Sequence, residues 1–322
     1  MGRTHARAFA TLADVRVVAV SSRSTERAAQ LAREVDATAM TDDAILDDPN
    51  IDAVSITLPT HLHRSAVIRA LRAGKHVLVE KPFALTVKDC DAMIAAHVSQ
   101  KSRRIFMVAH VLRFWPEYVA LVNLVQSGEL GKPISASAAR LSVVQKPGSW
   151  FTHADQSGGA IMDLMIHDLD ALNWIFGRPT MIYARGTRTK PGFWNHAHVV
   201  IGYGKREGAV EASHMQPNGH PFTMQLGVLC ERGKIEFIFR AGGAGVQDDA
   251  GGTSALTVYR NGGAQRIEVK DDDAYRVQAE YFVACVRQHR QPKLGTPMQA
   301  RLGVAMSWAA RRSLETGRVV TL

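Results

Sequence analysis

The stretch AVSITLPTHLHRSAVIRALRAGKHVLVEKP, residues 53–82, decides the fold class of this chain. It opens with an apolar, partly β-branched run at 53–58, as expected for a buried strand. A segment with helical spacing follows at 63–74 and closes on Gly74, a residue favoured directly after a helix. A second apolar run, HVLVE, occupies 76–80. A strand, a helix and a strand in this order predict parallel pairing through a right-handed crossover.

The same alternation continues on both sides of this stretch. The apolar run VRVVAV at 15–20 precedes a helical pattern at 24–35, and a helical pattern at 87–100 leads to the strand-like IFMVAHV at 105–111. Strands that alternate with helices predict a doubly wound α/β domain of Rossmann type over residues 1–114. Ligands of such sheets bind beyond the carboxyl ends of the strands, where this sequence places polar side chains.

Beyond residue 114 strands outnumber helices. The segments that read as strands are 134–144, 180–189, 197–204, 208–215, 222–240, 255–260 and 265–269. Helices are expected at 116–131, where a glycine ends the pattern, at 158–177, and at about 275–290 and 297–316. This pattern predicts an α+β domain over 115–322 with a large, mainly antiparallel open sheet. It leaves open whether the final helices pack back on the first domain.

Composition narrows the possible partners and the compartment. The chain has 322 residues, 46% of them hydrophobic, and a formal charge of +9. Its basic residues are scattered and do not interleave with aromatic ones, so we expect no nucleic-acid partner. No apolar run reaches the roughly 18 residues of a membrane span, so we expect no membrane partner. The three cysteines form no CxxC pair, which favours reduced thiols in a cytoplasmic protein.

Two features suggest acid–base chemistry. Asp163 and His167 are four residues apart within the predicted helix, so they share one face. A carboxylate beside an imidazole can orient it and favour its protonated form, although a solvated surface pair would show the same spacing. Lys81 follows the HVLVE run and precedes Pro82, which disfavours helical geometry at Lys81. Lys81 is therefore a candidate for binding a substrate hydroxyl at the end of a strand.

Three stretches of the chain closely resemble the Gfo/Idh/MocA oxidoreductase family, the group of glucose–fructose oxidoreductase and inositol dehydrogenase. They are GRTHARAF at 2–9, LPTHLHRSAVIRALRAGKHVLVEKPFALT at 58–86 and GGAIMDLMIHDLDALNWIFG at 158–177. The resemblance covers nearly the whole chain. It implies an NAD(P)-dependent dehydrogenase or reductase that transfers hydride between nicotinamide and a sugar, cyclitol or related polyol or ketose. We also expect a homodimer or homotetramer that associates through the C-terminal sheet.

The resemblance also implies roles for individual residues. Lys81, Asp163 and His167 would form the catalytic set, with His167 as the acid/base. The same three residues, together with Arg113 and Trp150, would bind the substrate. The residues expected beside the cofactor are Gly2, His5, Ser22, Arg23, Leu58, Pro59, Thr60, His63, Glu80 and Lys81.

The choice between NADP and NAD depends on residues 21–24. An acidic residue after this strand would hold the ribose hydroxyls of NAD, whereas this sequence has SSRS. Arg23 among serines would accept a 2′-phosphate, so NADP is the preferred expectation and NAD remains the alternative. If the Arg23 side chain pointed to solvent, the protein would discriminate only weakly between NADP and NAD.

Other functions remain open at this point. The pairs His61/His63 and His196/His198 could be metal ligands, and a metal-dependent hydrolase would need one. No third ligand stands at a recognisable metal spacing from either pair, so we expect no metal. A Rossmann-type regulatory or assembly subunit that binds nucleotide weakly is the alternative to an enzyme.

The beginning of the sequence departs from the family pattern. Gly2 matches the third glycine of the Gly-x-Gly-x-x-Gly motif, and His5 and Ala6 match the pair that follows it. The preceding strand and the first two glycines have no counterpart, so we expect an N-terminal truncation relative to the family. The strands at 15–20 and 53–58 would then flank a gap. Cofactor affinity would be poor and the first domain less stable.

Overall fold

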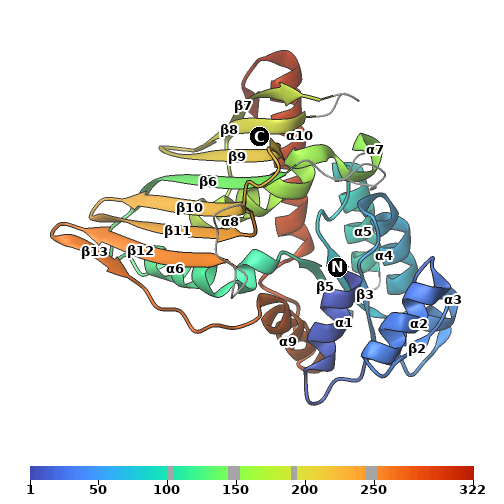
Figure 1. The fold of residues 1–322 in the computed structure, drawn as a ribbon. Helices are drawn as coiled ribbons and strands as arrows, with labels where there is room; N and C mark the ends of the chain where they lie inside the picture. Colours follow the sequence, from blue (N-terminus) through green and yellow to red (C-terminus); the bar gives the residue numbers. More distant parts are fainter. Residues whose placement is uncertain (100–103, 144–152, 190–193, 244–251) are drawn as a thin grey trace. The chain divides into compact units, whose positions relative to one another are not determined.

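The computed structural model describes residues 1–322 except 100–103, 144–152, 190–193 and 244–251 (Figure 1). The chain forms two compact units. Unit 1 consists of Met1–Phe114 and Asp272–Arg301, and unit 2 consists of Trp115–Asp271 and Leu302–Leu322. Among the described residues, no helix combines the length and the hydropathy that a membrane crossing requires.

Unit 1 contains a parallel three-stranded sheet in the order β3-β4-β5. β3 (Ala53–Ile56) is joined to β4 (His76–Glu80) through helix α4 (His63–Arg72), so the parallel pairing predicted from residues 53–82 is confirmed. Helix α5 (Val87–Ser99) leads to β5 (Phe106–Ala109), which pairs with β4. Every residue of β4 is buried because this strand has a neighbour on each side.

A second, two-stranded sheet in unit 1 pairs β1 (Ala19–Val20) with β2 (Thr38–Ala39) in parallel. The strand predicted over 15–20 is therefore shorter than expected, since only its last two residues enter a ladder. Helix α2 (Thr25–Glu34) joins β1 to β2, and the Ser24 side chain caps it by accepting a hydrogen bond from the Arg27 N–H. Helix α3 (Asp42–Asp47) follows β2.

Helices α1 (Gly2–Ala10) and α9 (Ala274–Arg287) pack together in unit 1. The rings of Phe9 and Phe282 meet edge to face at 6.3 Å. Both belong to an apolar cluster that includes Leu78 of β4 and Met107 of β5. The sequence places the final helices in the domain 115–322 and leaves open whether they pack back on the first domain; α9 contributes to the core of unit 1.

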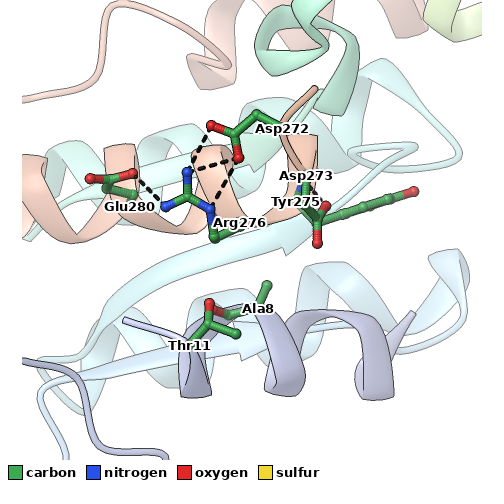
Figure 2. Close-up of polar contacts among 7 residues, drawn as sticks. All are labelled: Ala8, Thr11, Asp272, Asp273, Tyr275, Arg276 and Glu280. Carbon is green, nitrogen blue, oxygen red and sulfur yellow. Dashed lines mark hydrogen bonds and ion pairs between the residues drawn. The ribbon is translucent and has the colours of Figure 1, made fainter. Parts of the chain in front are cut away.

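The beginning of α9 is held by its own polar residues (Figure 2). The Asp273 carboxylate accepts a hydrogen bond from the Tyr275 N–H at 2.8 Å, which satisfies one of the free donors of the first turn. The Arg276 guanidinium lies between Asp272, at 2.8 Å, and Glu280, at 3.2 Å. The Asp273 cap marks the beginning of α9, and the two ion pairs lie along its first turns.

Unit 2 is built on a nine-stranded sheet in the order β13-β12-β11-β10-β6-β9-β8-β7-β14. The strands are β6 Pro133–Val143, β7 Met181–Arg188, β8 Trp194–Tyr203, β9 Arg206–Gln216, β10 Phe222–Cys230, β11 Gly233–Ala241, β12 Thr253–Arg260, β13 Gly263–Arg266 and β14 Val320–Thr321. Only the β6–β9 pair is parallel among these ladders, so the mainly antiparallel sheet expected for this part of the chain is confirmed. The segment 222–240 forms the hairpin β10–β11.

One face of this sheet is covered by α6 (Pro116–Gln126) and α8 (Ile166–Phe176), and α10 (Pro297–Thr316) continues into unit 2. A buried ion pair joins this layer to the sheet. The Arg140 guanidinium on β6 donates to both carboxylate oxygens of Asp168 on α8, at 2.9 and 3.0 Å. Along each strand, side chains that point to the helix-covered face alternate with side chains of the opposite face. The opposite face includes exposed residues such as Val200.

Candidate functional site

The side chain of His63 contacts the two segments of unit 1 that follow strands β3 and β4. Its side chain is fully buried, with Nε2 lying 2.8 Å from the carbonyl oxygen of Leu58 and Nδ1 3.0 Å from that of Pro82. Burial lowers the pKa of His63, although the backbone hydrogen bonds oppose this effect. The histidine therefore ties the chain after β3, which includes half-buried Pro59 and buried Thr60, to the chain after β4.

His5 on α1 links the ends of β3 and β4. Its Nε2 lies 2.8 Å from Oε1 of Glu80, and its Nδ1 lies 2.7 Å from Oγ of Ser55. Burial raises the pKa of the Glu80 carboxyl, but the hydrogen bond and charge of His5, with help from Lys81, more than offset this and lower it. Glu80 is thus held as a carboxylate inside the unit.

Lys81 stands directly after this network. Its backbone N–H donates to Oε2 of Glu80 at 2.9 Å, its side chain is half-buried, and its bond to Pro82 is cis. Arg113 lies in η2 (Val111–Phe114) and is buried, and its backbone N–H donates to the carbonyl of His110 at 3.0 Å. Trp150 lies outside the described residues.

Ser22 and Arg23 lie in the turn between β1 and α2, and both are exposed. The Ser22 hydroxyl accepts a hydrogen bond from the Ser24 N–H at 3.3 Å. No acidic residue occurs within positions 21–24, so this turn presents a cation and hydroxyl groups to its surroundings. Such a set suits a phosphate better than a ribose diol.

A cavity of about 450 Å³ lies within unit 1 along β1 and β3. Both strands line it, together with Phe9 of α1, Phe282 of α9 and, among the expected cofactor residues, Gly2, His5 and Leu58. β1 and β3 belong to separate sheets in the described part of the chain. A Cβ on Gly2 would lie 3.1 Å from Oγ1 of Thr57, so the beginning of α1 closely approaches the end of β3.

In unit 2, Asp163 and His167 occupy a junction between two kinds of helix. Residues Ile161–Met165 form the π-helix η4, and α8 begins at Ile166. The helix predicted over 158–177 is confirmed as a continuous helical run over 159–176, but residues 161–165 of it are π-helical. The expectation that Asp163 and His167 share an α-helical face therefore no longer follows, because a π turn is wider. Single π turns within α-helices are frequent at functional sites.

The structure adds His214 to this group. Its Nε2 lies 3.2 Å from Oδ2 of Asp163, and both side chains are largely buried. His214 lies on β9 and is buried like Val210 and Ala212, which stand four and two residues before it, so its side chain points to the helix-covered face with theirs. The only sequence signal was a histidine at an inward position of an alternating strand, and its partner is 51 residues away.

Comparison with known proteins gives matches over both units. Residues 1–110 match the family described as "Oxidoreductase family, NAD-binding Rossmann fold", and residues 118–236 match the "GFO/IDH/MocA C-terminal domain". Scyllo-inositol 2-dehydrogenase (NAD(+)) of Bacillus subtilis is 28% identical over 100% of this chain and 93% of its own length. Uncharacterized oxidoreductase ORF334 of Rhizobium meliloti is 30% identical over 95% of this chain and 91% of its own length.

Among solved structures, the aldose-aldose oxidoreductase of Caulobacter crescentus, crystallised with glycerol, has a TM-score of 0.86 and 24% identity. The match covers 99% of this chain and 96% of that one. At this identity the likeness concerns the fold. Its extent means that both units have counterparts in one known architecture.

Proposed function

The chain belongs to the Gfo/Idh/MocA family of oxidoreductases, and on this premise we propose that it transfers hydride between a nicotinamide cofactor and a CH–OH carbon of a sugar, cyclitol or related polyol. The relative named as a scyllo-inositol 2-dehydrogenase supports this substrate class. Which polyol is used, and in which direction, would depend on side chains of unit 2.

The observation that carries the proposal is the carboxylate–imidazole pair beside His167. Asp163 contacts His214 at the π–α junction, and His167 follows one turn later. In the proposed reaction His167 takes the hydroxyl proton when the substrate is oxidised. The contact between Asp163 and His214 holds the Asp163 carboxylate, and its negative charge, in place near His167. General-base catalysis of this kind contributes about 10²- to 10⁴-fold. Lys81 would donate a hydrogen bond to the reacting oxygen and stabilise its negative charge.

The residues of unit 1 fit a nicotinamide dinucleotide in part. The beginning of α1 has no side-chain cap from Met1, so its free N–H groups can face a pyrophosphate, and Gly2 leaves no Cβ in the narrow approach to Thr57. Leu58, Pro59 and Thr60 would line the cofactor, while His5, His63 and Glu80, whose side chains are occupied within the protein, would position that wall. The cofactor supplies the hydride acceptor or donor.

We propose NADP as the preferred cofactor. Exposed Arg23 with Ser22 would bind a 2′-phosphate through charge-assisted hydrogen bonds, and the absence of an acidic residue at 21–24 removes a source of repulsion. The NAD-binding description of the matched family supports a nicotinamide dinucleotide without choosing between the two.

The experiment is a screen of inositols and sugars with NADP and NAD, following reduced nicotinamide by absorbance, and then a comparison of His167→Ala with the wild type. We expect turnover to fall by at least about 10²-fold. His289→Asn is the matched control, because His289 is exposed in unit 1 and has a positive φ that asparagine tolerates. Full turnover in His167→Ala would exclude the acid/base role.

The alternative function is that of a regulatory or assembly subunit that binds nucleotide weakly. Quenching of tryptophan fluorescence by NADPH and NADH distinguishes the two, because an enzyme must bind at least one of them. For either function we propose homodimers or homotetramers through the open sheet face, which exposes Val200 and Leu229. Three buried free thiols support a reducing compartment such as the cytoplasm.

A further inference from the structure

We propose that His196, His198 and Glu211 form a binding site for a divalent transition-metal ion, with Zn²⁺ as the expected occupant. The site lies on the open face of the unit 2 sheet, on the opposite side from Asp163 and His214. It uses none of the residues placed in the proposed reaction. The pair His196/His198 lacked a third ligand in the sequence, and the fold supplies one from the next strand.

The strand pairing places the three side chains on one face. His196 and His198 are two residues apart on β8, so they point the same way. Glu211 on β9 is the direct cross-strand partner of His198 in the antiparallel ladder. β8 and β9 lie within the sheet and have neighbours on both sides, so the backbone that carries the ligands is held in place.

The distances suit coordination after small side-chain rotations. The rings of His196 and His198 lie perpendicular to each other with centroids 4.8 Å apart. Nδ1 of His196 is 4.0 Å from Oε1 of Glu211, and one ligand atom from each of the three residues lies within 4.8 Å of the others. Tetrahedral Zn²⁺ with bonds of about 2.0–2.1 Å holds its ligands about 3.4 Å apart. The three side chains therefore need to close by about 1 Å.

The donor set favours zinc over calcium or magnesium. Two imidazoles and one carboxylate are borderline ligands of the kind that Zn²⁺, Cu²⁺ and Ni²⁺ prefer, whereas Mg²⁺ and Ca²⁺ take mainly oxygen. Two neutral imidazoles and one carboxylate would leave a fourth position for water, as in open zinc sites. All three side chains are accessible in part in the single chain, His198 most of all, so an ion can reach them before a second copy covers this face.

The surroundings of the site are mixed in charge. Arg185 on β7 is the cross-strand partner of His198 on its other side, and its charge opposes a cation. On the side of β9, a hollow of about 440 Å³ is lined by Glu211 and Glu236, whose carboxylates favour one, and Glu236 is itself paired with Lys234 at 2.6 Å. The expected affinity is therefore moderate, and specificity comes from the two imidazoles.

The test is calorimetric titration of ZnCl₂ into the full chain, freed of its purification tag and of metal by EDTA and dialysed into phosphate-free buffer at pH 7.5. We expect one Zn²⁺ per chain, bound with moderate affinity. His198→Ala and Glu211→Gln should each weaken binding at least about tenfold, by analogy with changes around known metal sites. His61→Ala, which removes another exposed histidine, should leave the affinity unchanged.

The variants remove exposed or half-exposed groups, so circular dichroism and thermal unfolding without metal should match the wild type. A wild-type chain that takes up no Zn²⁺ at millimolar concentration would overturn the proposal. So would binding of equal strength in His198→Ala, or a ratio of one Zn²⁺ to two chains. As a second readout, Zn²⁺ should raise the unfolding temperature of the wild type and of His61→Ala but not that of the other two variants.

Discussion

Replacing His5 by alanine should lower the free energy of unfolding, because it leaves the buried Glu80 carboxylate of unit 1 without its histidine partner. The ring of His5 is the side-chain partner of Glu80 and is itself only 3% exposed, against 7% for Glu80. Its loss leaves Glu80 with the Lys81 N–H and leaves the Ser55 hydroxyl without the ring. Breaking a buried pair by removing one partner costs about 3–5 kcal/mol. Because His5 lines the cavity and water can enter there, we expect about 3 kcal/mol at pH 7.

The stability loss caused by His5→Ala should depend on pH, and the pKa of Glu80 determines in which direction. In the wild type the pKa of Glu80 is lowered, so its contribution to stability is present above the unfolded value of about 4.3 and is lost as the pH falls through the folded value. Without His5, burial acts with less opposition and raises the pKa of Glu80. The ionised carboxylate then penalises the folded state above its new pKa, so the loss should be large at pH 7 and shrink towards pH 4.

The assay is urea unfolding of wild type, His5→Ala and His5→Gln between pH 4.5 and 8, with His61→Ala as a surface control. His5→Gln should recover part of the loss, because its amide can donate to Glu80. A His5→Ala penalty that stayed constant across this pH range, or one no larger than that of His61→Ala, would refute the role assigned to this pair.

Three further outcomes follow from other sites. Asp168→Ala should destabilise unit 2 by about 3–5 kcal/mol in urea unfolding, because it leaves the Arg140 guanidinium buried without its carboxylate; near-neutral unfolding would contradict this. Arg23→Asp should shift the ratio of kcat/KM values from NADP towards NAD by about tenfold or more, and an unchanged ratio would mean that Arg23 does not contact the cofactor. Burial raises the pKa of the Cys90 thiol to about 12, so it should not react with a disulfide reagent at pH 8 until the chain unfolds, as read from thiol release with time.

Much of unit 1 could be predicted because its pattern is local. The strand–helix–strand order at 53–82 determines parallel pairing, and the turn residues Pro59 and Gly74 show where elements stop. The strand predicted over VRVVAV was too long, because the β-branched valines at 15, 17 and 18 have strand propensity whatever their neighbours. Ladder formation requires a partner strand, and in the described part of the chain only Ala19–Val20 of this run pair with one.

The pairs that matter chemically were harder to foresee. Helix–sheet packing brings Asp163 to His214, and strand register brings His198 to Glu211. Neither pair has a spacing along the chain that forms a recognisable motif. The π-helix at Ile161–Met165 was also invisible, because its apolar residues fit an α-helical pattern equally well. Local periodicity cannot report contacts that the tertiary fold creates.

The division of the unit 1 sheet also has a consequence for motion. No ladder hydrogen bond connects β1–β2 to β3–β4–β5 in the part of the chain that the structure describes. The contacts from the β1–β2 segment to the rest of unit 1 include surface ion pairs such as Arg3 and Arg7 with Glu34, which contribute only about 0–1 kcal/mol each. Residues 15–47 should therefore open as a cooperative unit of their own, exchanging amide hydrogens well before β4 does. Anything that bridged β1 to β3 would merge two folding units into one.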